Sequence, residues 1–217
     1  MLVNIVSYGG GTNSTAMLIG MKERGIKADL ILFADTGGEK PHTYRHIEEF
    51  SLWLLDAGMP GITIVRSPNE TLEQSCAKLK CLPSVAYGFK TCSQRFKIDP
   101  QEKFCNSDRM CIAEWALGRK VSRFIGFDAD ESHRSKPSGN EKYQNVFPLI
   151  EWNWGREECV DAIKLAGLSL PGKSACFFCP SSKKWEILDL NTRYPDLMER
   201  ALKMEAGAKL TSVKGLG

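Results

Sequence analysis

The sequence predicts an α/β fold in which helices cover a mostly parallel, doubly wound sheet. Short β-prone runs alternate with longer segments that have the apolar spacing of helices, and glycines stand where several of these segments end. One run, Asp29–Ala34, is apolar almost throughout, which is typical of a strand buried on both faces. Both observations favour parallel strands joined by helical crossovers.

The elements are expected in this order along the chain. The first strand, Leu2–Ser7, leads into a helix over Asn13–Arg24, which ends at a glycine. After the second strand, Asp29–Ala34, a proline suits the first turn of a helix over Pro41–Asp56. The remaining strands are expected at Ile62–Val65, Val121–Ile125 and Asn145–Leu149.

The alternation of strands and helices ends near Trp154, so we expect residues 1–154 to form one α/β domain. Residues 155–217 are expected to form a helical extension that carries the Cys176–Cys179 loop and packs with that domain as one unit. Ligands of a doubly wound sheet lie at the carboxyl ends of its strands. The loops after the first, second and fourth strands should therefore converge on one crevice; they are Ser7–Ser14, Asp35–Lys40 and Gly126–Arg134.

The composition, 42% hydrophobic and 25% charged, is ordinary for a soluble globular protein. No apolar run reaches the length of a membrane span, and the start of the chain lacks the pattern of a secretory signal. We therefore expect a cytoplasmic protein with no membrane partner. The net charge of +3 is compatible with nucleic acid but does not require it. In a reducing compartment the 8 cysteines favour metal binding, catalysis or burial over a disulfide framework.

Three consecutive glycines, Gly9–Gly11, stand between the first strand and the following helix. Glycines let the backbone approach an anion closely, and a helix N-terminus offers free N–H groups and a partial positive charge. Thr12, Asn13 and Ser14 add hydroxyl or amide donors, or cap the helix. A tight turn without a ligand is the alternative, although such a turn needs only one glycine. The segment predicts a phosphate site, in neither the Walker A form nor the dinucleotide form.

Residues Ser7–Ser14 resemble the PP-loop, S-G-G-x-D-S, of the ATP pyrophosphatase superfamily, with Gly9 in place of serine and Asn13 in place of aspartate. Further segments, in the same order along the chain, resemble the branch of adenylylsulfate and phosphoadenylylsulfate (PAPS) reductases. They are Asp35–Gly37 (D-T-G), Thr91–Pro100 (C-C-x-x-R-K-V-x-P), Ile125–Arg134 (G-x-R-x-x-[QE]-S-x-x-R, with Asp128 for the first arginine), Phe147–Trp152 (N-P-L/V-x-x-W) and Cys176–Cys179 (C-x-x-C).

The resemblance implies a Rossmann-like fold of the adenine nucleotide alpha-hydrolase type that binds ATP, or another adenine nucleotide, with Mg²⁺. The nucleotide-binding residues that it implies are Ser7, Gly9, Gly10, Gly11, Thr12, Asn13, Ser14, Asp35, Thr36, Gly37 and Gly126. The residues that it places in catalysis are Asn13, Ser14, Asp35, Arg95, Lys97 and Arg134. Asp35 would bind magnesium or a ribose hydroxyl, and the cations would pair with phosphate or sulfate oxygens. Taken singly, Asp35 is equally well explained as a helix cap, and each cation as part of a solvated surface.

The spacing of Cys176 and Cys179 lets both sulfurs bind one metal ion or cluster. In the adenylylsulfate reductases, this C-x-x-C and an earlier cysteine pair hold a [4Fe–4S] cluster, and here Thr91 replaces the first cysteine of that pair. The resemblance therefore favours a [4Fe–4S] cluster bound by Cys92, Cys176 and Cys179, beside the nucleotide.

The fourth ligand of this cluster is left open. Cys81, Cys105 or a non-protein ligand would complete the set, and zinc or metal-free buried thiols are the alternatives to iron. The remaining cysteines, Cys76, Cys111 and Cys159, lie in helix-like segments and are expected in the core.

The order of the motifs leaves more than one reaction. The reductases use a nucleophilic cysteine on a C-terminal tail, and no cysteine follows Cys179. We therefore expect adenylation: ATP is split to pyrophosphate, AMP is placed on an acceptor oxygen, and sulfur displaces AMP. This is similar to the ATP-pyrophosphatase subunits of DNA phosphorothioation systems.

That similarity implies a cysteine desulfurase and nucleic-acid-modification subunits as partners, and it leaves direct contact with DNA and a homodimer open. One alternative is reduction of a sulfonucleotide, with the tail truncated. The other is a nucleotide-binding sensor or regulatory subunit, whose main support is the uncharged Asn13.

Overall fold

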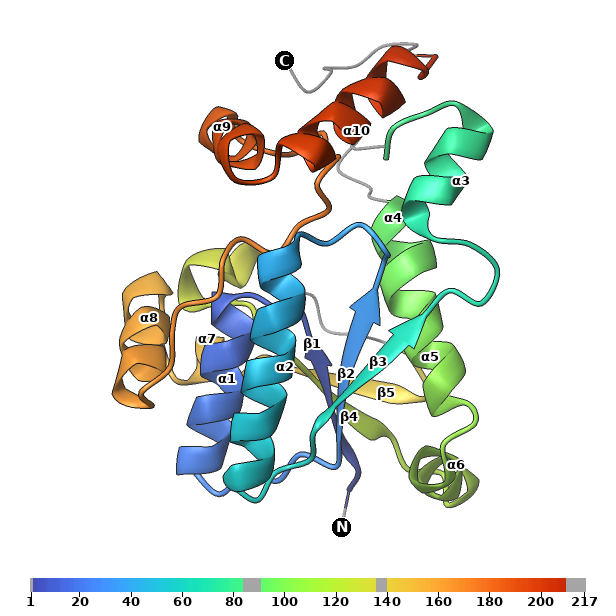
Figure 1. The fold of residues 1–217 in the computed structure, drawn as a ribbon. Helices are drawn as coiled ribbons and strands as arrows, with labels where there is room; N and C mark the ends of the chain where they lie inside the picture. Colours follow the sequence, from blue (N-terminus) through green and yellow to red (C-terminus); the bar gives the residue numbers. More distant parts are fainter. Residues whose placement is uncertain (1, 84–90, 136–139, 210–217) are drawn as a thin grey trace. The chain divides into compact units, whose positions relative to one another are not determined.

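The computed structural model describes residues 2–83, 91–135 and 140–209. Its strands form a parallel sheet in the order β3-β2-β1-β4-β5 (Figure 1). They are β1 (Asn4–Tyr8), β2 (Leu30–Asp35), β3 (Ile62–Arg66), β4 (Val121–Ile125) and β5 (Tyr143–Val146). In β1, Val6 pairs with Ile31 on one side and with Phe124 on the other. The strand order reverses between β1 and β4, which is the topological switch point of the sheet.

Helices cover both faces of this sheet (Figure 1). One face carries α1 (Thr12–Glu23), α2 (Pro41–Asp56), α7 (Pro148–Glu151) and α8 (Arg156–Leu165), and the other carries α5 (Asp99–Cys105) and α6 (Arg109–Ala116). Successive strand residues point to opposite faces, so Val6 joins the first core and Ile5 the second. Because both faces are covered, every residue of β2 after Leu30 is buried. The doubly wound α/β fold is confirmed.

Contacts divide the chain into two compact units. The first comprises residues 1–34, 41–65 and 101–174, and the second comprises residues 35–40, 66–100 and 175–217. The second unit has its own apolar core, which includes Leu72, Phe178 and Leu190. Its helices are α3 (Leu72–Leu79), α4 (Thr91–Ser93), the π-helical turn η2 (Gln94–Ile98), α9 (Lys184–Arg193) and α10 (Pro195–Ala206). This division differs from a boundary after residue 154, because α8 packs with the sheet while mid-chain segments pack with the C-terminal helices.

The elements expected from the sequence are present, with ends that match the prediction in α2 and β4 and shift by one or two residues in most of the others. The last strand differs most. It covers Tyr143–Val146 rather than Asn145–Leu149, because Pro148 begins the short helix α7 and proline suits a first helical turn. Among the described residues, no helix is long and apolar enough to cross a membrane.

Candidate functional site

The glycine-rich loop Gly9–Gly11 connects β1 to α1. Gly10 has a φ of 70°, and a Cβ atom there would lie 3.2 Å from Thr43 Cγ2 and 3.3 Å from Phe33 Cε2. A Cβ atom on Gly11 would have Ser174 Cβ as its nearest neighbour, at 3.9 Å. The fold itself therefore requires glycine at position 10, whereas a Cβ atom at position 11 would make only an ordinary contact, so packing does not require glycine there.

The amino end of α1 is available to an anion. Gly11 is the N-cap residue, and no side chain in the described part of the chain caps the helix. The hydroxyl of Ser14 is used within the loop, because it accepts from the Gly9 N–H at 3.2 Å and donates to the Gly11 carbonyl at 3.1 Å. The backbone N–H groups of the first turn and the positive end of the helix dipole can then bind phosphate.

The loop after β4 packs directly on this first turn. A Cβ atom on Gly126 would lie 3.0 Å from both Cα and N of Ser14, so only glycine allows this approach. Asn13 Nδ2 donates to Asp128 Oδ2 at 2.7 Å, and Asn13 Oδ1 accepts from Arg156 at 3.2 Å. The structure therefore brings together the predicted loops after the first and fourth strands, at the switch point. The loop after β2 belongs to the second unit.

A segment that the sequence did not single out lies along the glycine-rich loop. Ser174 Oγ donates to the Gly9 carbonyl at 2.7 Å, and His42 Nε2 lies 3.4 Å from the carbonyl oxygen of Lys173. These contacts place Lys173 next to the residue that bonds the loop. The sequence shows a lysine and a serine directly after Pro171 and Gly172, which is a pattern typical of a loop. Nothing in the sequence links these residues to the glycine-rich loop, which is far away in the chain.

A buried polar chain lies under the same loop. Tyr8 Oη is 3.1 Å from Thr15 Oγ1, which is 3.2 Å from His46 Nε2. The ring of His46 stacks on Phe50. Burial lowers the pKa of His46 and raises the pKa of Tyr8. These contacts join β1, α1 and α2, and they fix the residue that immediately precedes Gly9.

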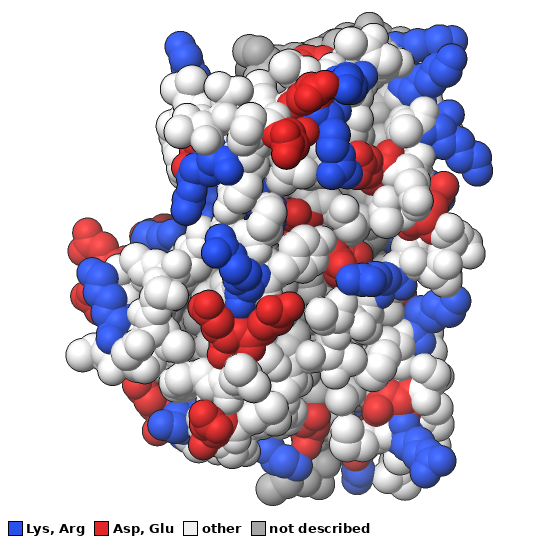
Figure 2. Space-filling view, in the orientation of Figure 1, with Lys and Arg blue, Asp and Glu red and all other residues white. Residues whose placement is uncertain are grey.

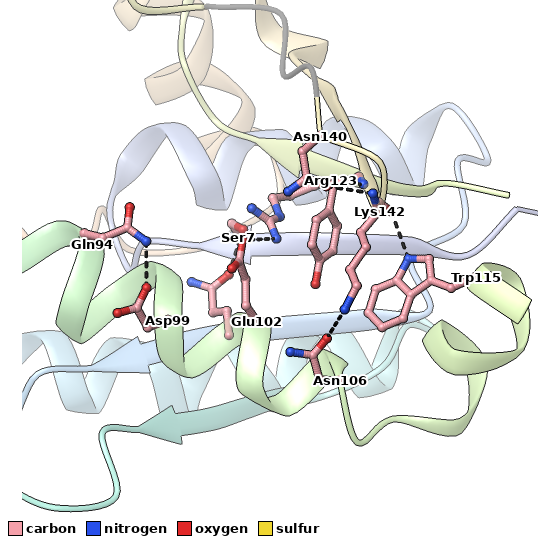
Figure 3. A network of polar contacts seen from close by, with 11 residues as sticks. Ser7, Gln94, Asp99, Glu102, Asn106, Trp115, Arg123, Asn140 and Lys142 are labelled. Atoms are coloured by element: carbon pink, nitrogen blue, oxygen red, sulfur yellow. Dashed lines mark hydrogen bonds and ion pairs between the residues drawn. The ribbon is translucent and has the colours of Figure 1, made fainter. Parts of the chain in front are cut away.

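Ser7, which the resemblance placed among the nucleotide-binding residues, turns toward α5. Its hydroxyl donates to Gln101 Oε1 at 2.7 Å. On the same side of the sheet Arg123 donates to Glu102 at 3.1 Å and lies over the ring of Tyr143 (Figure 3). The Ser7 side chain thus has a partner on the face opposite α1, and its role at the nucleotide stays a prediction.

In the second unit, the D-T-G segment forms a tight turn. Asp35 is buried, accepts from the Gly37 N–H at 2.7 Å and pairs with Arg66, whose Nε lies 2.8 Å from Oδ2. Gly37 has a φ of 75°, which favours glycine, and Thr36 Oγ1 lies 3.1 Å from Cys176 Sγ. The expected role of Asp35 toward magnesium or ribose stays a prediction, and its carboxylate already has a cationic partner.

Each of the three cations predicted to contact phosphate or sulfate has an acidic partner. Arg95 Nη2 lies 2.7 Å from Glu70 Oε1. Lys97 Nζ lies 3.8 Å from Glu39 Oε1, and Arg134 Nη1 lies 2.5 Å from Glu131 Oε1. Burial alone would lower the pKa of Lys97, but Glu39 and the neighbouring thiols raise it, so the side chain stays charged.

The second unit gathers the cysteines of the predicted metal site. Cys92 and Cys179 pack against the core that contains Cys76 and Cys176. Burial is the main cause that raises the pKa of Cys176 and of Cys76, each to about 12, and for Cys76 the neighbouring thiol of Cys81 acts in the same direction. Both thiols are therefore protonated at neutral pH unless a metal replaces the proton. As placed, the described residues contain no group of three or more side chains arranged to hold a metal ion.

The two candidates for a fourth ligand lie in different units. Cys81 belongs to the second unit, with Cys92, Cys176 and Cys179. Cys105 belongs to the first unit, where it is buried beside Cys111. A hydrogen bond with Cys111 lowers the pKa of Cys105. Cys81 is therefore the candidate that fits the gathered set. The expected core cysteines, Cys76, Cys111 and Cys159, are buried.

No family model matches this chain. The chain is similar to an uncharacterized nin region protein, ORF290, of Escherichia phage lambda, at 28% identity over 163 residues, which are 65% of this chain and 53% of that protein. It is also similar to the uncharacterized protein MJ0066 of Methanocaldococcus jannaschii, at 26% identity over 206 residues, which are 90% of this chain and 40% of that protein. The chain thus spans about half, or less, of the length of these relatives.

Proposed function

We propose that this protein is an ATP pyrophosphatase that adenylates an acceptor for sulfur transfer. The observation that carries the proposal is the uncapped amino end of α1, which follows Gly9–Gly11 and packs on Gly126 at the switch point of the sheet. Phosphates bind at such helix ends, and open α/β sheets bind their ligands at such switch points. The resemblance of these segments to PP-loop motifs supports an adenine nucleotide as the ligand.

In the proposed reaction an acceptor oxygen attacks the α-phosphorus of ATP. The bond to the β-phosphate breaks, pyrophosphate leaves, and AMP becomes the leaving group that a sulfur nucleophile displaces. The chain contributes positioning and charge: the first turn of α1 binds phosphate oxygens, and Ser174 holds the loop through the Gly9 carbonyl.

The cysteines of the second unit support a role in sulfur chemistry. Lys97 lies near Cys92, Cys176 and Cys179, and its partner Glu39 lies near Cys176, so the thiols have an ion pair beside them. When bound, a [4Fe–4S] cluster would supply an electrostatic centre, and zinc would suit the same thiolates. Cys92, Cys176 and Cys179 would hold it, with Cys81 as the fourth candidate. This donor set fits either metal by its chemistry, although its side chains would have to turn toward a common point.

DNA phosphorothioate modification, with a cysteine desulfurase as sulfur source, is the setting that we propose. Figure 2 shows Lys and Arg interspersed with Asp and Glu on the face drawn, without a broad region of one sign. This supports recruitment of DNA through partner subunits rather than through that face, because phosphate backbones are bound by clustered cations.

Release of pyrophosphate from ATP tests the proposal. The purified chain is incubated with ATP, Mg²⁺ and a DNA acceptor, with a desulfurase and cysteine present, and pyrophosphate and AMP are measured. We expect both products in equal amounts. Nucleotide binding without any turnover would favour the sensor, and thioredoxin-dependent sulfite from adenylylsulfate or phosphoadenylylsulfate would favour the reductase. Either result would overturn the proposal.

A further inference from the structure

Asp128 is a buried carboxylate at the glycine-rich loop, only 4% exposed. Its oxygens accept from Asn13 Nδ2 at 2.7 Å and from the Glu131 N–H at 3.0 Å. Both donors are neutral. In the part of the chain that the structure describes, no lysine or arginine forms an ion pair with it. Asp128 is also the N-cap residue of the short helix η3 (Ala129–Arg134), whose amino end offsets part of this charge, and no ion pair within the described residues offsets the rest.

The charged groups around Asp128 are already committed elsewhere. The guanidinium of Arg156 donates to Asn13 Oδ1 at 3.2 Å, and its backbone N–H donates to Asp130 at 3.2 Å. Arg134 pairs with Glu131. The uncharged amide of Asn13 therefore lies between a carboxylate and a guanidinium, with the positive charge held one residue away from Asp128.

Asp35, the carboxylate that is expected from the sequence to bind magnesium, differs from Asp128 because it has a cationic partner. Asp35 has Arg66 within 2.8 Å and the Gly37 N–H on its other oxygen. Its negative charge is thus neutralised by the protein. Of the two, Asp128 is the carboxylate that no lysine or arginine of the described residues pairs with.

We infer that Asp128 binds the divalent cation that accompanies the nucleotide, and that Asn13 positions it. The inference rests on the proposed function. Mg²⁺ takes oxygen ligands, usually one or two carboxylates together with phosphate oxygens, and keeps several waters. The 2.7 Å bond from Asn13 places the carboxylate at the first turn of α1, where the phosphates bind. Each oxygen of Asp128 accepts one hydrogen bond and retains a lone pair for the cation.

An exchange of the two side chains tests this inference. Asp128→Asn keeps the shape and removes the charge. The double variant Asn13→Asp with Asp128→Asn returns a carboxylate to the other side of the same hydrogen bond, and Asn at position 128 still accepts from the Glu131 N–H. Asp130→Asn is the matched control, since Asp130 lies two residues away and contacts Arg156 rather than Asn13.

The measurement is the affinity for ATP by calorimetry, with Mg²⁺ and then with EDTA, on variants whose melting temperatures show that they fold. We expect Mg²⁺ to tighten binding in the wild type and in Asp130→Asn. In Asp128→Asn this enhancement should fall roughly tenfold or more, and the double variant should not regain it, because a carboxylate at position 13 would be neutralised by Arg156. An undiminished enhancement in Asp128→Asn, or an equal loss in Asp130→Asn, would overturn the inference while leaving nucleotide binding intact. A wild type that binds no nucleotide in either condition would overturn the proposed function itself.

Discussion

Alanine at each of the three loop glycines should give three different results. At Gly9 a Cβ atom would meet Ser14 Oγ at 3.7 Å, which is an ordinary contact. At Gly10 it would face Thr43 and Phe33 at 3.2 and 3.3 Å, with a φ of 70°. At Gly11 its nearest neighbour would be 3.9 Å away, beside the uncapped end of α1. The fold constrains only the second position.

The magnitudes follow from these contacts. Gly10→Ala should cost about 1–3 kcal/mol of unfolding free energy, from its left-handed backbone and its crowding. Gly11→Ala should cost about 0.5–1 kcal/mol, since alanine is a poorer N-cap than glycine. Its methyl group would separate a phosphate from backbone donors, and a hydrogen bond to a charged group contributes about 1.5–3 kcal/mol. Since about 1.4 kcal/mol is tenfold in affinity, Gly11→Ala should weaken ATP binding roughly tenfold or more.

Chemical denaturation and calorimetry with ATP separate the two effects. We expect Gly9→Ala to keep the stability of the wild type, Gly10→Ala to lose stability, and Gly11→Ala to lose mainly affinity. Wild-type affinity in Gly11→Ala would refute the placement of phosphate at this helix end. Wild-type stability in Gly10→Ala would refute the packing argument.

Two further predictions concern the cysteines and a histidine. Serine at Cys92, Cys176 or Cys179 should lower the iron or zinc content of anaerobically purified protein, and serine at Cys159 should not; equal metal content in all four variants would contradict the shared site. Burial lowers the pKa of His46, so its contribution to stability is present above pH ~6.5 and is lost as the pH falls toward the folded-state pKa. Melting temperatures between neutral and mildly acidic pH should therefore fall less in His46→Gln than in the wild type, and parallel curves would show that this histidine does not titrate on unfolding.

The sequence was sufficient for the sheet because its signals are local. The apolar run in β2 and the proline that begins α2 each fix an element from neighbouring residues alone. The end of β5 was misplaced because Phe147 and Leu149 suit a strand, while Pro148 between them starts a helix. At that point the backbone constraint of proline outweighed the apolar pattern.

The site was only partly accessible from the sequence. The glycine-rich loop is contiguous, and so was found. The contacts of Asn13 with Asp128 and Arg156 join residues more than 100 positions apart, with |i−j| of 115 and 143. The same holds for Ser174 and Gly9, at |i−j| of 165. No periodicity or motif pairs such residues, because only the order of the strands brings their loops together.

Titration of ATP into the wild-type chain in the presence of Mg²⁺ tests the central claim most directly. We predict saturable binding at one site per chain, competed by other adenine nucleotides and weakened by Gly11→Ala. Absence of binding by a folded protein, or binding that Gly11→Ala leaves unchanged, would contradict a nucleotide site at the amino end of α1.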